Sequence, residues 1–252
     1  MIFIINIILT ALYMTGWFVI GRSKNRLDVA DVGWGGGFVI VAFSSFLVRP
    51  TPWTIIILIL VTIWGCRLAY HISKRNSGKA PDPRYLELSS RWPANNFWVR
   101  AYFSVFLTQA LLIFLVSLPI TLAATKSIPL RFLALGGVVL WLTGFLFEVL
   151  ADRQLARFIS NPANKGQIMQ QGLWRYSRHP NYFGEIVLWW GIAALAFGAS
   201  GTALVVIGPI VITILLVFVS GIPPIERRYK NNSKYQQYAI KTSILVPWPV
   251  KS

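Results

Sequence analysis

Seven long apolar runs dominate this chain of 252 residues. An α-helix needs about 20 mostly apolar residues to cross the hydrocarbon core of a bilayer, where every backbone N–H and C=O must be bonded within the protein. The pattern therefore predicts an all-α integral membrane protein, folded as a single membrane domain over residues 1–252. The seven predicted transmembrane helices cover residues 1–21, 29–48, 52–71, 101–124, 130–150, 184–199 and 202–222.

The distribution of positive charge predicts the orientation of these helices. The chain contains 24 Lys and Arg residues and carries a formal net charge of +16. All of them except Arg49, Lys126 and Arg131 fall on one side of the predicted bundle. Because Lys and Arg are enriched in cytosolic loops, we expect the N-terminus outside and the C-terminus in the cytosol. Topology thus explains the net charge, and no nucleic-acid partner is predicted.

Negative charge gathers on the same predicted side, although acidic residues contribute little to orientation. This placement predicts a polar functional site at the cytosolic ends of the helices. With one cysteine, Cys66, and two histidines, neither a disulfide framework nor a metal site is expected. The eight acidic residues are Asp28, Asp31, Asp82, Glu87, Glu148, Asp152, Glu185 and Glu226.

The stretch 172–191 concentrates polar residues at the predicted start of the sixth helix. Ser177 can cap this helix, and Pro180 suits its first turn. Free N–H groups and the helix dipole there, together with basic side chains, favour an anion such as phosphate. The alternative is a basic patch that faces lipid headgroups. We favour a ligand site, because headgroups alone do not require the polar residues that share this turn: Arg175, Tyr176, Arg178, His179, Asn181, Tyr182 and Glu185.

A carboxylate pair lies near the inner end of the fifth predicted helix. Glu148 and Asp152 are spaced i, i+4 and share a helix face. Buried carboxylates are costly without partners. Two interpretations stay open: bonds to the 178–179 region or to a ligand, or a structural ion pair with Arg153 or Arg157.

The stretch 64–85 carries a polar stripe from the third predicted helix to the surface. Arg67, His71 and Arg75 follow one helix face. Arg67 lies deep enough to be functional, or it extends its charged end back to the surface. A turn around Pro81–Pro83 is expected to hold Asp82, Arg84 and Tyr85 in a loop.

Two further stretches flank predicted helices. In residues 25–37, Asp28 is expected to cap the second helix, and Gly33 and Gly37 to form a face for close helix packing. Asp31 falls inside that helix and needs a partner. In residues 221–238, a Pro pair is expected to start a new helix whose first turn holds Glu226, Arg227 and Tyr229, while Tyr235 and Tyr238 look interfacial.

Taken together, these stretches resemble the membrane-embedded steroid 5-alpha-reductase C-terminal family, in particular its bacterial DUF1295-like branch. The resemblance extends from about Asn25 to Pro249 and rests on WGCRL, RNSGK, DPRY, GLWRYSRHPNYFGE, GIPPIERR and VPW. Within it, an RHPxYxGE segment is also similar to isoprenylcysteine carboxyl methyltransferases and phospholipid methyltransferases. The bacterial branch implies a multi-pass protein of the bacterial inner membrane, with its site facing the cytosol.

The family resemblance implies a seven-helix enzyme that reduces an enone with NADPH. The cofactor-binding half of the chain would be about residues 140–252. Carried over by motif, the cofactor contacts are Glu148, Asp152, Tyr176, Arg178, Asn181, Tyr182 and Glu185, with the Arg175–His179 cluster at its phosphates. We add as candidate cofactor contacts Arg67, Arg75, Asp82, Arg84, Tyr85, Glu226 and Arg227. The family's catalytic Glu and Tyr do not align securely, so Asp31, Tyr70 and His71 are taken as the candidate catalytic residues. His179-Pro180-Asn181 and Glu148 depart from the pattern of the steroid-hormone reductases, which places steroid specificity in doubt.

Three functions can be weighed. The first is an NADPH-dependent reductase of a lipophilic, steroid-like or isoprenoid-like enone that enters from the bilayer among membrane lipids. The second is an S-adenosylmethionine-dependent methyltransferase of a membrane lipid or lipidated substrate. The basic rim favours the anionic NADPH over the cationic sulfonium. The third is a transporter, which the near absence of ionisable residues in the outer half argues against.

Overall fold

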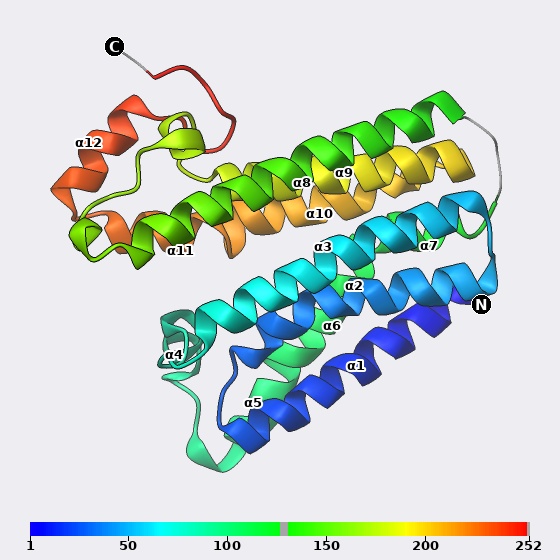
Figure 1. Ribbon diagram of the computed structural model, residues 1–252. Coiled ribbons are helices and arrows are strands. Elements are labelled where there is room, and N and C mark those ends of the chain that lie inside the picture. The colour runs from blue at the N-terminus through cyan, green and yellow to red at the C-terminus, as the bar shows by residue number, and fades with distance from the viewer. Residues whose placement is uncertain (127–130, 251–252) are drawn as a thin grey trace. The chain divides into compact units, whose positions relative to one another are not determined.

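The computed structural model describes residues 1–126 and 131–250. Seven of its helical segments are long and apolar enough to cross a membrane, which confirms the predicted number (Figure 1). The predicted start of the fifth helix at residue 130, and Lys251 in the count of positive charge, lie outside the described residues. The candidate spans are Ile2–Lys24, Val29–Val48, Pro52–Asn76, Ala94–Val116, Phe132–Ser160, Pro180–Ser200 and Ala203–Tyr229.

Helices account for nearly all of the regular structure. Ser177 and Ser243 form one isolated bridge, and the described residues contain no strand. A π-helical segment, Tyr102–Leu107, connects α5 to α6, and another, Leu215–Val219, follows α10. The α-helices are α1 (Ile2–Lys24), α2 (Val29–Val48), α3 (Pro52–Asn76), α4 (Pro83–Ser89), α5 (Phe97–Ala101), α6 (Thr108–Val116), α7 (Leu118–Ala123), α8 (Arg131–Ser160), α9 (Pro180–Ser200), α10 (Ile207–Ile214), α11 (Ile222–Tyr229) and α12 (Ser233–Lys241).

The internal contacts divide the chain into two compact units. Unit 1 comprises Met1–Arg131 and Leu195–Gly208, and unit 2 comprises Phe132–Ala194 and Pro209–Ser252. The boundaries fall at the start of α8 and inside α9 and α10, so each unit is built from two separate parts of the chain.

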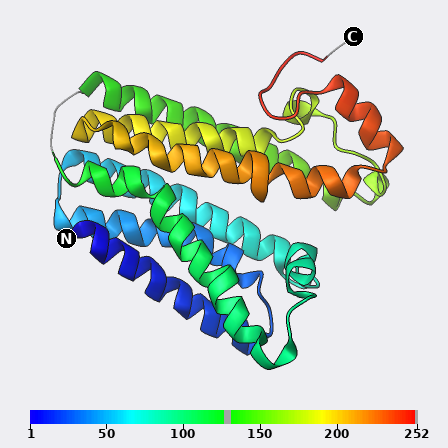
Figure 2. The ribbon, with the colours of Figure 1, turned by 180° about the vertical axis from the view of Figure 1, so that it is seen from behind.

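Close helix packing in unit 1 depends on glycine. A β-carbon added at Gly35 of α2 would lie 2.4 Å from the carbonyl oxygen of Gly65 in α3, so the two backbones touch. At Gly33 and Gly37 it is the side chains of Trp17 and Ile113, respectively, that pack against the helix backbone. The prediction of a close-packing face on α2 is therefore confirmed, but its backbone-to-backbone contact lies at Gly35. Figure 2 shows α6 crossing α1 and α2 obliquely in this unit.

In unit 2, α8 and α9 pack antiparallel with their backbones in contact. β-Carbons added at Gly144, Gly184 and Gly191 would lie 2.4–2.5 Å from the backbone nitrogens of Leu188, Glu148 and Trp141, respectively. Substituting any of these glycines would force the helices apart. The contact presses Glu148 against the first turns of α9, and only 2% of Glu148 is exposed.

Candidate functional site

The loop that precedes α9 in unit 2 is held against α8. The Trp174 Nε1–H donates to the Ala151 carbonyl oxygen at 3.0 Å, and the Leu173 N–H donates to Gln154 Oε1 at 2.9 Å. Trp174 and Ala151 also belong to a small apolar cluster with Met169. Because the loop is bonded to α8, the positions of Arg178 and His179, which follow it, are fixed relative to α8.

The segment after α12 pairs with the same loop. The Arg178 N–H donates to the Ser243 carbonyl oxygen at 2.8 Å, and the Trp248 N–H donates to that of Tyr176 at 3.0 Å. The Ser177 hydroxyl donates to the Leu245 carbonyl oxygen at 2.6 Å and accepts the His179 N–H at 3.1 Å. Ser177 thus bonds the backbone amide of the residue before α9 and ties this entry to the C-terminal segment, whereas a cap on the helix itself stays a prediction.

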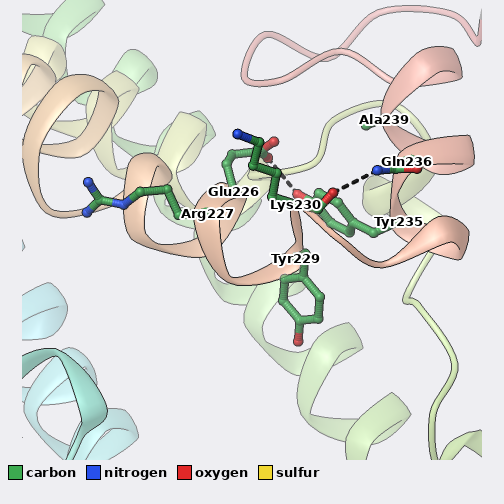
Figure 3. A pocket seen from close by; sticks show the side chains of 7 residues that line it. All are labelled: Glu226, Arg227, Tyr229, Lys230, Tyr235, Gln236 and Ala239. Atoms are coloured by element: carbon green, nitrogen blue, oxygen red, sulfur yellow. Dashed lines mark hydrogen bonds between the residues drawn. The ribbon is translucent and has the colours of Figure 1, made fainter. Parts of the chain in front are cut away.

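A single carboxylate organises the polar centre of unit 2. Glu226 of α11 accepts from Arg178 Nη1 at 2.5 Å through one oxygen. Its other oxygen lies 3.0 Å from His179 Nε2 and accepts the Tyr235 hydroxyl proton at 2.5 Å, a bond that is visible in Figure 3. The His179 ring stacks on Tyr182 with centroids 5.6 Å apart. Residues from the 172–191 and 221–238 stretches therefore meet, and they form the centre of the candidate site.

Burial controls protonation at this centre. Burial lowers the pKa of His179 below its usual value, since the hydrogen bond to Glu226 offsets the desolvation only in part. A neutral His179 must carry its proton on Nε2 to donate to Glu226. Burial and the Glu226 carboxylate both raise the pKa of Tyr235, which stays a hydrogen-bond donor at neutral pH.

The two tyrosines of α12 were predicted to be interfacial, and this prediction is wrong. Tyr235 is 7% exposed and Tyr238 is 4% exposed. Tyr238 donates its hydroxyl to the carbonyl oxygens of Trp174 and Ser177. An interfacial Tyr and a Tyr buried under a loop share the same amphipathic pattern in sequence, so only the tertiary contacts distinguish them.

The carboxylates of α8 and α9 are buried. Glu148, Asp152 and Glu185 are 2%, 8% and 8% exposed. Asn181 Nδ2 donates to Asp152 Oδ1 at 3.2 Å, a partner that neither sequence interpretation included. Asn181 Oδ1 is buried and has no hydrogen-bond partner among the residues that the structure describes.

Two pockets border this centre. The first, of about 310 Å³, lies between α11 and α12 (Figure 3). Its wall includes Glu226, Arg227, Lys230 and Tyr235. The second, of about 400 Å³, lies between Arg178 and the segment that follows α12. Of the other predicted contacts on the loop, Arg175 is exposed and Tyr176 is 43% exposed.

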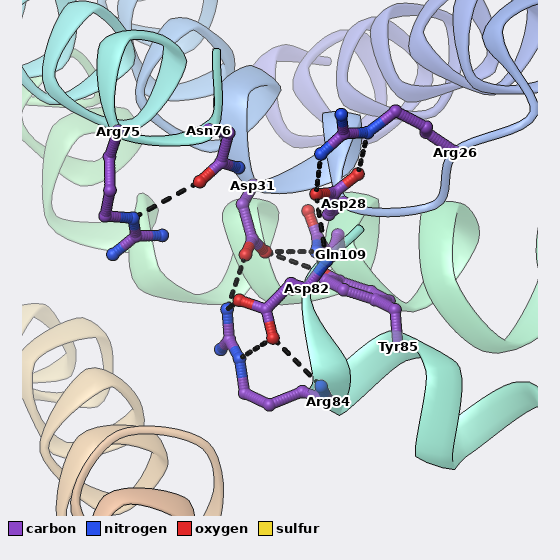
Figure 4. A network of polar contacts seen from close by, with 9 residues as sticks. All are labelled: Arg26, Asp28, Asp31, Arg75, Asn76, Asp82, Arg84, Tyr85 and Gln109. Carbon is purple, nitrogen blue, oxygen red and sulfur yellow. Dashed lines mark hydrogen bonds and ion pairs between the residues drawn. The ribbon is translucent and has the colours of Figure 1, made fainter. Parts of the chain in front are cut away.

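Unit 1 contains a separate polar network around Asp31 (Figure 4). The Tyr85 hydroxyl donates to Asp31 at 2.5 Å, Arg84 Nη2 donates to it at 2.8 Å, and Gln109 Nε2 bridges to the Tyr85 oxygen at 3.0 Å. Burial and the Asp31 charge raise the pKa of Tyr85 well above its usual value, so Tyr85 stays protonated. Arg84 and Tyr85 were predicted to lie in a loop, but Pro83 starts the short helix α4 that carries both.

Asp28 does not cap α2 as predicted. Its side chain makes no cap hydrogen bond. Instead the carboxylate accepts hydrogen bonds from Arg26 Nε at 2.9 Å and Arg26 Nη2 at 2.7 Å. It also accepts one from the Asp82 N–H at 3.2 Å. Burial would raise the pKa of Asp28, but these donors outweigh it and hold the pKa below its usual value. Asp28 thus fixes the loop after α3 to the start of α2.

The candidate catalytic residues do not all meet. Asp31 bonds Tyr85, whereas Tyr70 is 67% exposed with the Lys74 ammonium 5.9 Å from its ring centroid. The structure thus joins Asp31 to Tyr85, and the catalytic roles of Asp31, Tyr70 and His71 stay predictions. His71 and Arg67 lie on α3 in unit 1, and Arg75 Nε donates to Asn76. Sequence reasoning missed Gln109, although a lone amide in an apolar run was a usable signal.

Comparison with known proteins places the chain in a family. Residues 17–242 match the family described as protein of unknown function DUF1295. The chain belongs to the DUF1295 family. It is 40% identical over 68 residues to 3-oxo-5-alpha-steroid 4-dehydrogenase 1 of Homo sapiens, covering 27% of this chain and 26% of that protein. It is 31% identical over 122 residues to the Bos taurus protein of the same name, covering 48% and 43%.

A third relative is an uncharacterized protein of Schizosaccharomyces pombe, 29% identical over 163 residues, with coverage of 56% and 46%. The DUF1295 chain thus spans less than half the length of each of these relatives. The predicted resemblance to steroid 5-alpha-reductases is confirmed, and the local similarity to isoprenylcysteine carboxyl methyltransferases stays a prediction. No solved structure matches.

Proposed function

We propose that this DUF1295 protein is an NADPH-dependent membrane reductase of the double bond of a lipophilic enone, and that unit 2 holds the cofactor. The observation that carries the proposal is the Glu226-centred cluster, in which Arg178, His179 and Tyr235 meet beside two cation-lined pockets. The similarity to proteins named 3-oxo-5-alpha-steroid 4-dehydrogenase supports the class of reaction.

The residues present suit an anionic dinucleotide. The two pockets are lined by the cations Arg178, Arg227, Lys230 and Lys241 and by the single carboxylate Glu226. Arg178 Nε is buried without a hydrogen-bond partner among the described residues, so this guanidinium keeps donor capacity beyond its pair with Glu226. Guanidinium and ammonium groups are the side chains that bind phosphate best.

NADPH, when bound, supplies a hydride to the electron-poor carbon of an enone. The protein's own part at this site is orientation: Glu226 fixes Arg178, and the C-terminal segment fixes the backbone of the same residue. We keep Asp31, Tyr70 and His71 as candidates for the acid at the substrate carbonyl. A lipophilic substrate would enter from the bilayer, where a dry surrounding strengthens such hydrogen bonds.

Methyl transfer from S-adenosylmethionine is the second candidate. The observation that favours it is the burial of Glu148, Asp152 and Glu185 along α8 and α9, because carboxylates suit a sulfonium cation. In the pockets of unit 2, however, cationic side chains outnumber carboxylates, which suits an anionic cofactor better than a sulfonium cation. We therefore rank the reductase first.

Cofactor titration of the purified protein in detergent tests the proposal. The chain contains 11 Trp residues, so binding can be followed by quenching of their fluorescence. We expect saturable binding of NADPH, and at least about tenfold weaker binding for Arg178→Ala, equivalent to ~1.4 kcal/mol. Arg153→Ala is the matched control, since Arg153 is exposed on α8.

Turnover is then measured with a 3-oxo steroid whose double bond is conjugated to the ketone, as loss of NADPH absorbance. Saturable binding of S-adenosylmethionine together with no binding of NADPH would overturn the reductase proposal. Equal NADPH affinities for Arg178→Ala and the wild type would remove the Glu226-centred cluster from the cofactor site.

A further inference from the structure

The pocket of about 400 Å³ behind Arg178 has a chemistry that the proposed reaction does not by itself explain. Its wall combines cations, hydroxyls and one large aromatic side chain, and none of the residues that line it is acidic. The lining is made by the end of α12 and the segment after it, and includes Lys241, Thr242, Ser243, Ile244, Trp248 and Pro249.

The C-terminal side of this pocket is fixed by its backbone. Ser243 and Trp248 are both bonded to the loop before α9 through main-chain hydrogen bonds of 2.8 and 3.0 Å. Thr242 is 6% exposed, and its hydroxyl lies 3.4 Å from the Arg175 carbonyl oxygen. The backbone of this segment is therefore held in place without a ligand, which lowers the entropic cost of binding one.

Two side chains are available to a ligand there. Lys241 is exposed and makes no ion pair with any residue that the structure describes. Trp248 is 66% exposed although its backbone is bonded, so the indole faces open space. An ammonium without an ion pair and an indole that line the same pocket suit a ligand that joins a phosphate to a flat aromatic ring.

We propose that this pocket binds the phosphorylated adenosine end of the dinucleotide, with Trp248 against the base and Lys241 at the ribose 2′-phosphate. This inference rests on the proposed function and adds to it the residues that select NADPH over NADH. The phosphate of an anionic lipid shares part of this chemistry, and exposed Trp and Lys also occur at membrane interfaces. A lipid headgroup, however, offers no aromatic ring for the indole.

Calorimetric titration of the full chain with NADPH, NADH and adenosine 2′,5′-bisphosphate distinguishes these cases. We expect Lys241→Ala to weaken NADPH and the bisphosphate about tenfold and to leave NADH unchanged, because NADH lacks the 2′-phosphate. Trp248→Ala should weaken all three ligands, and Trp248→Phe should restore them. Lys165→Ala, an exposed lysine in another loop, is the control.

The outcomes separate the two proposals. Wild-type NADPH affinity in Lys241→Ala and Trp248→Ala, together with loss of affinity in Arg178→Ala, would overturn this inference and leave the proposed function standing. Absence of NADPH binding in the wild type would overturn the proposed function and this inference with it. In nanodiscs, displacement of the bisphosphate by phosphatidylglycerol but not by phosphatidylcholine would assign the pocket to lipid and overturn the inference. Helix content by circular dichroism confirms that each variant is folded.

Discussion

The Glu226 carboxylate lies 2.5 Å from the Arg178 guanidinium across 48 positions of the sequence. Since Arg178 precedes α9 and Glu226 lies on α11, the pair joins the entry of α9 to α11 within unit 2. The same carboxylate accepts a hydrogen bond from the Tyr235 hydroxyl of α12. One side chain thus connects three elements that the sequence separates.

Glu226→Gln should destabilise the protein while keeping the shape of the side chain. The amide cannot accept from three donors as the carboxylate does, and hydrogen bonds to charged groups contribute about 1.5–3 kcal/mol each. We expect a loss of ~2 kcal/mol in the free energy of unfolding, measured by thermal denaturation in detergent. The matched control is Glu87→Gln, at an exposed position, which should leave the midpoint unchanged. Equal midpoints for both variants would contradict the assigned role.

Stability should fall as the pH is lowered from about 7 to 5. The pKa of His179 is lowered by burial, so the unfolded chain takes up this proton near its ordinary pKa of about 6.5, before the folded protein does. Glu226 and Arg178 are the charged groups that face the imidazole. Carboxylates of the unfolded chain protonate only below about pH 4.5, so they do not obscure the effect.

The measurement is the unfolding midpoint as a function of pH for the wild type and His179→Gln. The variant should lose the slope between about pH 6.5 and 5. The other histidine of the chain is His71, so His71→Gln is the matched control. This variant should keep the pH dependence of the unfolding midpoint. A slope that persists in His179→Gln would assign it to another group.

Tyr85→Phe and Asp31→Asn should prove coupled. The Tyr85 hydroxyl donates to Asp31 at 2.5 Å and accepts from Gln109, so removing it takes the shortest donor from Asp31, which keeps Arg84, and the nearer acceptor from Gln109. Each single change should cost about 1–3 kcal/mol, and the double variant should cost less than the sum. A double-mutant cycle on thermal unfolding measures the difference. Additive costs would show that the pair contributes no interaction energy.

Gly35→Ala should separate α2 from α3. The new β-carbon would meet the Gly65 carbonyl oxygen at 2.4 Å, and backbone cannot rotate away as a side chain can. Overpacking of this kind costs about 1–3 kcal/mol. Gly16→Ala is the control, because nothing lies within 4 Å of a β-carbon added there. Thermal unfolding of both variants in detergent should show a loss for Gly35→Ala alone.

The seven spans could be predicted because length and apolar content alone specify a membrane helix. The grouping of the 172–191 and 221–238 stretches was also accessible, since both adjoin helix ends on one side. The hydrogen-bond partners of individual side chains could not be predicted from the sequence. Asp28 bonds Arg26 instead of capping α2, and the partner that Asp31 needed is Tyr85, 54 positions away. Such choices depend on how a loop folds back, which local propensity does not determine.

The pairing of Ser243 and Trp248 with the loop before α9 has a consequence for biosynthesis. Arg178 is synthesised before α9, but its backbone N–H gains its partner only when the chain has been extended to Ser243, and Tyr176 gains its partner only at Trp248. The helices can therefore form one after another while the pocket between Arg178 and the segment after α12 stays incomplete. Closure of this pocket is thus the last step in the maturation of unit 2, because it waits for the final residues of the C-terminal segment.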